Sequence, residues 1–210
     1  MSTTFNIAVF ISGTGSNLAA ILKNQKKYHY CVALVISNKA NAKGLQHAKK
    51  YNIPTFCFKW DKNDPNLTIV QKELKKHTID LIALAGFMRI LPAEFINFYK
   101  NRIINIHPSL LPKYKGLHTH QQVIDNKDKF HGASVHYVTA KLDAGKIITQ
   151  VQIRVPNKCD AKSLAAQLLF SEHALFPYTI GLIAQNRVQW RENTLYIDDK
   201  ELTQPLIIYK

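Results

Sequence analysis

The apolar residues of this chain gather in short runs that alternate with amphipathic segments. Four runs have the length and composition of buried strands, and they lie at Phe5 to Ile11, Cys31 to Ile36, Ile53 to Cys57 and Ile79 to Ala85. Helical patterns follow the first three of them, at Leu18 to Lys23, Gly44 to Tyr51 and Leu67 to His77. This alternation predicts an α/β fold with a doubly wound, mainly parallel, Rossmann-like sheet and right-handed crossovers.

The pattern changes in the second half of the chain. The alternating segment Gly132 to Thr139 and the long apolar segment Ile147 to Val155 are joined by a turn. We expect these two segments to form an antiparallel, hairpin-like extension of the sheet. Asp160 is expected to cap a long helix that continues to Ile183. The last segment, Val188 to Lys210, has short strand-like pieces and is expected to be peripheral.

The size of the chain suits one domain, since 210 residues with 46% hydrophobic content allow a substantial core. No apolar run approaches the roughly 20 residues of a membrane span, and the N-terminus lacks signal-peptide features. We therefore expect a soluble, cytoplasmic protein without membrane contact. Cys31, Cys57 and Cys159 lie far apart in the sequence, so neither disulfides nor a metal site is expected.

The formal net charge of +14 comes largely from lysines on the expected solvent faces of helices, such as Lys72 to Lys76. Lysine in such positions is first of all a solubilising residue. Nucleic-acid binding is an alternative that rests on charge alone, because no arginine cluster or aromatic stacking pattern accompanies it. The positive field also favours an anionic small-molecule substrate.

One stretch carries the clearest chemistry, from Asn105 to His120. Asn105 and His107 lie two residues apart at the end of a strand-like run that begins at Ile103, so their side chains point to the same face. That end of a parallel strand is where open α/β sheets bind ligands. An amide donor beside an imidazole suits a reaction that develops negative charge on a carbonyl oxygen and moves a proton. If the turn at Asp143 folds back over this pair, its carboxylate would orient the imidazole.

Two further loops are candidates for ligand binding. Gly13 and Gly15 lie between the first strand and the first helix, where a tight turn can present backbone amides to a phosphate. The alternative is a simple turn with Ser16 or Asn17 as N-cap. The loop Gly86 to Pro92 carries apolar side chains that either line a pocket for a flat ring or fill the core beneath the next helix.

Together these motifs resemble those of phosphoribosylglycinamide formyltransferases, a family of folate-dependent formyltransferases. The resemblance extends from Asn6 to about Asn193 and rests on an ordered set of motifs: Ile11 to Asn17, Ser37 to Ala40, Leu84 to Leu91, Asn105 to Lys113, Gly116 to His120 and Gly132 to Asp143. It implies transfer of a formyl group from 10-formyltetrahydrofolate to the amine of glycinamide ribonucleotide in purine synthesis. The implied partners are these small molecules, with a monomer or homodimer as the functional form.

The resemblance also implies roles for individual residues. The catalytic positions are Asn105, His107 and Asp143. The phosphate-binding positions are Gly15, Ser16 and Asn17, and Glu172 contacts the ribonucleotide. The folate-binding positions are Met88, Arg89, Ile90, Leu91, Asn105, Thr139, Ala140, Lys141, Leu142 and Asp143, with Lys62 as a further candidate. By this reading, residues 1–100 form the phosphate-binding half, 101–190 the catalytic and folate-binding half, and 191–210 a tail.

Two departures and two rivals accompany the resemblance. The first departure is the region Asp61 to Thr68, which contains Lys62 and matches the family poorly. In the second, Ala144 and Lys146 stand where the family commonly has glycine and proline, which bears on the stiffness of the turn. The same catalytic set occurs in formyltetrahydrofolate hydrolases and in enzymes that formylate methionyl-tRNA. Both carry an additional domain, for which we expect no room in this chain.

Overall fold

The structure, a computed structural model, describes residues 4–61 and 67–209 and divides into two compact units, Met1–Ile104 and Asn105–Lys210. The first unit is a parallel sheet with helices on both faces. Its strands are β1 (Asn6–Ile11), β2 (Cys31–Ser37), β3 (Thr55–Cys57) and β4 (Leu81–Leu84). They follow the order β4-β1-β2-β3, and every pair in this series is parallel.

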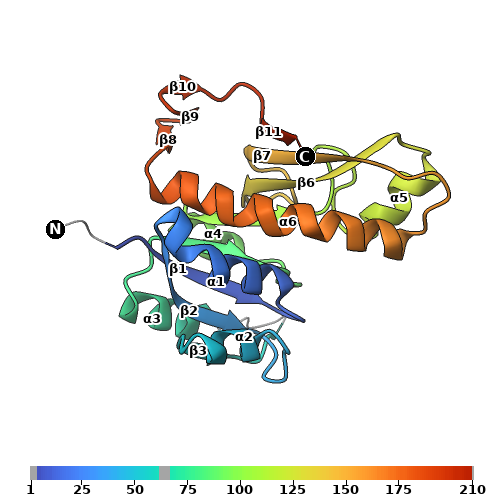
Figure 1. Cartoon of the computed structure of the whole chain (residues 1–210). Coiled ribbons are helices and arrows are strands. Elements are labelled where there is room, and N and C mark those ends of the chain that lie inside the picture. The colour runs from blue at the N-terminus through green and yellow to red at the C-terminus, as the bar shows by residue number, and fades with distance from the viewer. Residues whose placement is uncertain (1–3, 62–66, 210) are drawn as a thin grey trace. The chain divides into compact units, whose positions relative to one another are not determined.

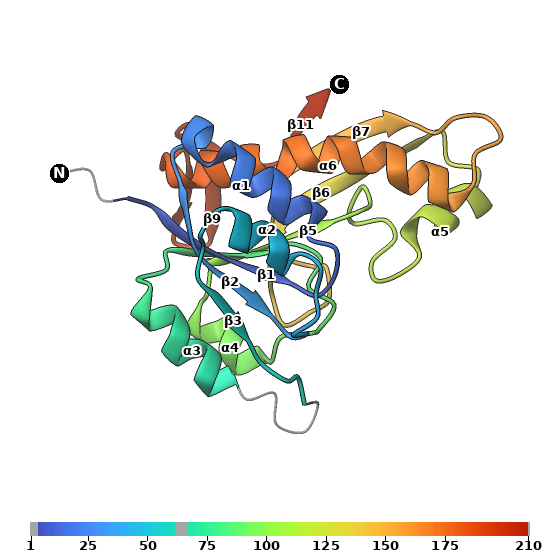
Figure 2. The ribbon, with the colours of Figure 1, turned by 60° about the horizontal axis from the view of Figure 1, so that its bottom comes forward.

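The helices of the first unit are α1 (Ser16–Tyr28), α2 (Leu45–Lys50), α3 (Leu67–Lys76) and α4 (Ala93–Phe98). Figure 2 shows α1 and α2 on one face of β1, β2 and β3, with α3 and α4 on the other. The spacing of Leu67, Val70 and Leu74 explains how α3 covers the sheet, because all three are buried on one face of that helix. The doubly wound arrangement is therefore confirmed.

The second unit begins within β5 (Ile103–His107), whose first two residues belong to the first unit. The order of its strands is β11-β7-β6-β5, with β6 (Phe130–Tyr137), β7 (Ile147–Arg154) and β11 (Leu206–Tyr209). The pair β6 and β7 is antiparallel, which confirms the expected extension. Figure 1 shows α6 (Ala161–Ala184) running along β6 and β7, and the hydroxyls of Thr149 and Thr179 join β7 to this helix at 2.6 Å.

Asp160 caps α6 as expected, since its carboxylate accepts from the Ser163 backbone N–H at 2.7 Å and a reciprocal capping box is complete. The alternative in which Ser16 or Asn17 is the N-cap of α1 is wrong, because the N-cap is Gly15. The helix α5 (Thr119–Asp125) is an element that the sequence patterns do not predict.

The C-terminal segment contains a small antiparallel sheet of β8 (Val188–Arg191), β9 (Thr194–Ile197) and β10 (Lys200–Glu201). The last strand of the C-terminal segment, β11, does not belong to this small sheet. It pairs in parallel with β7, from Leu206 opposite Thr149 to Tyr209 opposite Gln152. The tail therefore contributes a strand to the sheet of the second unit. Of the helices in the described part of the chain, none combines the length and apolar character that a membrane span requires.

Candidate active site

The strand β5 presents Asn105 and His107 on one face, as the alternation of strand side chains requires. His107 is only 5% exposed, while Asn105 is half-buried. A third residue, Asp143, comes from the turn after β6, and its Oδ2 lies 3.5 Å from Nδ1 of His107. The turn does fold back over the strand, so the amide, the imidazole and the carboxylate all belong to one cluster in the second unit.

The other side of His107 meets the backbone. Its Nε2 lies 2.8 Å from the carbonyl oxygen of Tyr114. A carbonyl oxygen can only accept, so Nε2 carries a proton, and a carboxylate faces Nδ1. Since both neighbours are acceptors, the ring can donate to both only as an imidazolium. The Tyr114 carbonyl and the Asp143 carboxylate therefore orient the imidazole from its two nitrogens.

Asp143 is fixed by the backbone of a second loop. Its Oδ2 accepts a hydrogen bond from the Gly116 N–H at 2.9 Å, and its side chain is 8% exposed. The turn that carries it is closed by a hydrogen bond of 3.0 Å from the Tyr137 N–H to the Lys146 carbonyl. A Cβ on Gly145 would come within 1.7 Å of the Tyr137 carbonyl oxygen. The close approach therefore depends on Gly145, whereas Ala144 and Lys146 are exposed.

His136 is a further member of the cluster, for which the sequence patterns predict no role. Its Nε2 lies 3.2 Å from Asn105 Nδ2 and 3.6 Å from Asp143 Oδ1, while its Nδ1 lies 2.9 Å from the Tyr137 carbonyl oxygen. Burial lowers the pKa of His136 below its ordinary range, although Tyr137 and Asp143 oppose the shift. Strand alternation along β6 could have indicated that His136 shares a face with Ser134.

Ser134 organises the loop that follows β5. Its hydroxyl donates to the Ser109 carbonyl at 2.6 Å and accepts from the Leu111 N–H at 3.1 Å and the Gln150 amide at 2.8 Å. Gln150 also donates to the Leu111 carbonyl at 2.9 Å. These bonds are buried, so they hold the loop firmly and support the placement of His107 at the end of the strand.

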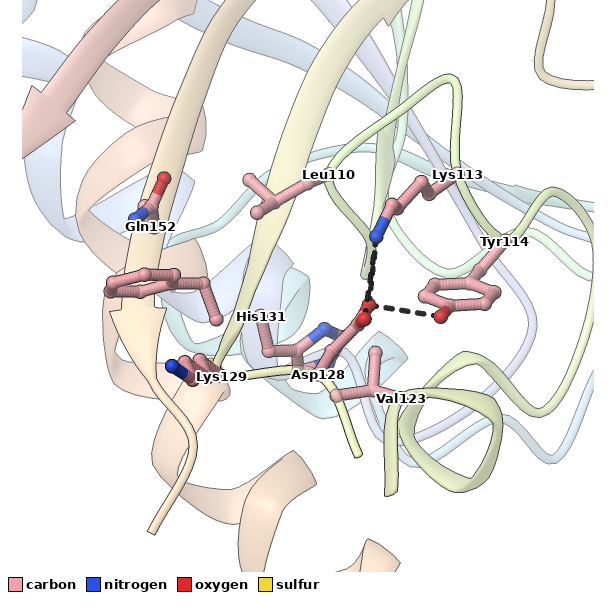
Figure 3. A pocket seen from close by; sticks show the side chains of 9 residues that line it. Leu110, Lys113, Tyr114, Val123, Asp128, Lys129, His131 and Gln152 are labelled. Atoms are coloured by element: carbon pink, nitrogen blue, oxygen red, sulfur yellow. Dashed lines mark hydrogen bonds and ion pairs between the residues drawn. The ribbon is translucent and has the colours of Figure 1, made fainter. Parts of the chain in front are cut away.

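A pocket of about 390 Å³ lies beside this loop in the second unit, and Figure 3 shows Lys113, Tyr114 and Asp128 along its rim. The Tyr114 hydroxyl donates to Asp128 at 2.9 Å, and Lys113 Nζ lies 3.2 Å from the same carboxylate. Burial opposes ionisation of Asp128, but the hydrogen bonds from Tyr114 and Lys113 hold its pKa below the ordinary range. Asn105, His107 and Asp143 are not among the residues that line this pocket, whereas Tyr114 lines it and also contacts His107 through its carbonyl oxygen.

A second pocket, of about 400 Å³, does reach the cluster. Asp143 lines it together with Leu111, Pro112, Lys115, Ala144, Gly145, Lys146, Ile147, Thr203, Gln204 and Pro205. Within the described residues, no group of three or more His, Cys, Asp and Glu side chains is placed to hold a metal ion.

The glycine-rich turn of the first unit depends on Gly15 at the N-cap of α1. Gly15 takes a left-handed φ of 74°, and a Cβ there would lie 2.6 Å from the Gly44 Cα. The N-cap glycine has no side chain that could accept from the first turn of α1, which begins at Ser16.

The loop after β4 is tied to that turn within the same unit. Ser12 Oγ accepts from the Met88 N–H at 2.9 Å and donates to Asn38 Oδ1 at 2.6 Å. Met88 and Ile90 are 65% and 72% exposed, whereas Leu91 is buried. Core filling therefore explains Leu91 but not Met88 or Ile90, whose exposed side chains suit contact with a ring.

The remaining candidate residues are placed as follows. Thr139, Ala140, Lys141 and Leu142 are exposed on the turn before Asp143, and the Thr139 hydroxyl donates to the Lys141 carbonyl at 3.1 Å. Arg89 is exposed beside Met88. Glu172 is buried in α6 at 8% exposure. Lys62 lies outside the described residues.

The α/β fold with an amide, an imidazole and a carboxylate at a strand end defines an enzyme that moves a carbonyl-containing group. The chain belongs to the formyl transferase family, which it matches over residues 5–180. It is 41% identical to the phosphoribosylglycinamide formyltransferase of Escherichia coli over 94% of this chain and 95% of that one. The structure of the Anaplasma phagocytophilum phosphoribosylglycinamide formyltransferase has a TM-score of 0.91 at 38% identity, covering 99% of this chain and 100% of that one.

A relative with a different activity is also similar in structure. The formyltetrahydrofolate deformylase of Pseudomonas syringae has a TM-score of 0.86 at 26% identity, with 93% of this chain and 66% of that chain covered. The two phosphoribosylglycinamide formyltransferases are matched over nearly their whole length, which favours the transferase activity.

Proposed function

We propose that this protein transfers the formyl group of 10-formyltetrahydrofolate to the amine of glycinamide ribonucleotide, a step of purine biosynthesis. The observation that carries the proposal is the cluster of Asn105, His107 and Asp143 in a chain matched end to end by phosphoribosylglycinamide formyltransferases. The amine lone pair attacks the formyl carbon, and the carbonyl becomes an oxyanion. When the carbonyl reforms, the bond from carbon to the folate nitrogen breaks, the folate nitrogen gains a proton, and the former amine loses one.

Asn105 is the proposed oxyanion donor. An amide N–H aimed at the developing charge stabilises the transition state more than the ground state, which is the condition for faster turnover. Asn105 is half-buried in the middle of β5, and its amide nitrogen lies 3.2 Å from Nε2 of His136.

His107 is the proposed proton carrier. The Asp143 carboxylate at 3.5 Å stabilises the imidazolium and sets the orientation of the ring. As the intermediate collapses, His107 assists proton transfer to the folate nitrogen, for which the hydrogen bond to Tyr114 has to be released. General acid catalysis of this kind typically contributes about 100- to 10,000-fold to a rate.

The two units contribute separate binding loops. In the first unit, residues 1–100 form the phosphate-binding half, with the ribonucleotide phosphate at Gly15, Ser16 and Asn17. Met88 to Leu91 contact the pterin ring. Residues 101–190 carry the catalysis and the folate-binding turn Thr139 to Asp143, and Glu172 contacts the ribonucleotide. Residues 191–210 form the tail, and we propose a cytoplasmic enzyme acting as a monomer or homodimer.

The test is a steady-state assay with 10-formyltetrahydrofolate that follows tetrahydrofolate release by absorbance, with and without glycinamide ribonucleotide. We expect release only when the ribonucleotide is present. Release without it would replace the transferase by a deformylase, and no release in either case would point to another formyl acceptor or to the nucleic-acid alternative. The Asn105→Ala variant serves as the matched control. If its activity is lost as expected, the measured rate comes from this site.

A further inference from the structure

His136 is buried next to Asn105, the proposed oxyanion donor, and next to Asp143, which faces His107. It is 2% exposed, and each ring nitrogen has one near polar neighbour at hydrogen-bond distance. Nδ1 lies 2.9 Å from the Tyr137 carbonyl oxygen, and Nε2 lies 3.2 Å from the Asn105 amide nitrogen. The state of this ring therefore decides how the Asn105 side chain is held.

The neighbours of His136 select one tautomer. The Tyr137 carbonyl can only accept, so Nδ1 carries the proton. An amide NH2 can only donate, so a neutral His136 accepts from Asn105 through the lone pair of Nε2. In the opposite amide orientation the Asn105 oxygen would face Nε2. That oxygen can only accept, so Nε2 would have to carry a proton in addition to the one on Nδ1, and the ring would be cationic.

Burial decides between these two states. The charged groups that face His136 are Asp143, with Oδ1 at 3.6 Å, which favours the cation, and His107, which disfavours it. Desolvation outweighs the attraction of Asp143, since the pKa of His136 is lowered overall. The neutral ring is therefore the stable form near pH 7, and it accepts from the Asn105 NH2 group.

We propose that His136 is a positioning residue that fixes the Asn105 amide with its nitrogen toward the histidine. In this orientation one N–H is taken by His136, and the second remains on the amide for the oxyanion. The inference rests on the proposed function and deepens it. Without this acceptor the amide has two nearly isosteric orientations, and in one of them its oxygen would face the negative charge that it has to stabilise.

The kinetic test uses two substitutions of His136. His136→Leu removes the acceptor, and we expect kcat to fall at least about tenfold with little change in the KM of either substrate, because a transition-state donor is lost. His136→Gln can place an amide oxygen near the position of Nε2, so it should recover most of that loss. A Gln variant as slow as the Leu variant would overturn the proposal.

A double-mutant cycle separates action through Asn105 from action through Asp143. If His136 works by orienting Asn105, His136→Leu should have little further effect on kcat in an Asn105→Ala background. If the full loss persists in that background, the effect passes through Asp143 or through general packing, and the proposal fails. Thermal unfolding of each variant controls for loss of the fold.

A spectroscopic test needs neither a variant nor activity. In ¹⁵N-labelled wild-type protein at pH 7, the imidazole ¹⁵N shifts of His136 should show a protonated Nδ1 and an unprotonated Nε2. A protonated Nε2, in either the neutral or the cationic ring, would contradict the proposal. Because this readout is independent of the formyl acceptor, it distinguishes failure of the positioning role from failure of the proposed function.

Discussion

Gly116 and Asp143 are joined by a hydrogen bond of 2.9 Å from the glycine N–H to Oδ2 of the carboxylate. The same oxygen is the one that lies 3.5 Å from His107. One carboxylate oxygen therefore fixes the loop that follows β5 and faces the imidazole, so the position of the loop and the environment of the ring are set together.

Substitution at Asp143 should separate these two effects. Asp143→Asn keeps an oxygen that can accept from Gly116 but removes the charge beside His107, so we expect kcat to fall about 100-fold with an unchanged melting temperature. Asp143→Ala removes the acceptor as well, and the Gly116 amide should then exchange its hydrogen faster. Hydrogen exchange measured on both variants checks the distinction; equal exchange in the two would refute the anchoring role of the carboxylate.

Asn105→Ala should leave the fold intact and remove most of the activity. The loss of one oxyanion donor typically costs about 100- to 1000-fold in turnover, and the substitution leaves only a small gap at a half-buried position. Steady-state kinetics with thermal unfolding as the control measure both properties. A nearly normal rate would show that Asn105 is not the donor.

The tight turn after β6 allows a comparison of neighbouring positions. Gly145→Ala would bring a Cβ within 1.7 Å of the Tyr137 carbonyl oxygen, so the turn has to move and Asp143 with it. We expect a loss of about 2 kcal/mol in unfolding free energy and a marked fall in kcat. Ala144→Gly is the matched control at an exposed position, and it should change the unfolding free energy and kcat little. The prediction fails if both variants behave alike.

The turn before α1 allows a second comparison. Gly15→Ala combines a left-handed φ of 74° with a Cβ only 2.6 Å from Gly44, so we expect destabilisation by about 1 to 3 kcal/mol. It should also raise the KM for glycinamide ribonucleotide, because the first-turn amides of α1 would be displaced. A Cβ at Gly13 meets no atom within 4 Å, so Gly13→Ala is the control for stability. Equal melting temperatures for the two variants would contradict this account.

A contact between His120 of α5 and His131 of β6 predicts how the stability of the protein depends on pH. His120 Nδ1 lies 2.9 Å from His131 Nε2. The pKa of His131 is lowered from 6.5 to about 4, mainly by burial and to a smaller extent by the charge of His120. Between these two values the unfolded chain binds more protons than the folded one, so stability falls as the pH drops through this window. The loss is at most on the order of 3 kcal/mol by pH 4.

Urea unfolding at a series of pH values from 7.5 to about 4 measures this dependence. His131→Gln keeps a polar side chain but cannot titrate, so its unfolding free energy should change less steeply across the same window. A variant with the slope of the wild type would show that other groups carry the pH dependence. The lowered pKa of Asp128 adds a separate loss at lower pH, as that carboxylate becomes protonated.

Much of the fold could be predicted because parallel strands buried on both faces leave continuous apolar runs, as in β1 and β4. The helix α5 could not, since its N-cap is His118 in a left-handed conformation with φ of 60°, without the usual Ser, Thr, Asp or Asn signal. The pairing of β11 with β7 is a long-range contact, and a short apolar strand does not specify its partner.

The candidate site shows the same division between local and long-range information. That Asn105 and His107 share a face follows from strand geometry alone. Their association with Asp143 depends on a turn in which Asp143 takes a left-handed φ of 45° and Gly145 approaches the Tyr137 carbonyl closely. His136 could be placed on its strand, but its relation to Asn105 depends on register between distant segments and on which ring nitrogen carries the proton.

The parallel pairing of β11 with β7 has a consequence for the behaviour of the protein at high concentration. The backbone of β7 from Thr149 to Gln152 would otherwise offer unpaired groups to the strand of another molecule. The four-residue β11 covers that stretch and leaves a much shorter outer edge than the eight-residue β7 would present. By this pairing, the C-terminal residues reduce the length of β7 backbone with which another molecule could pair.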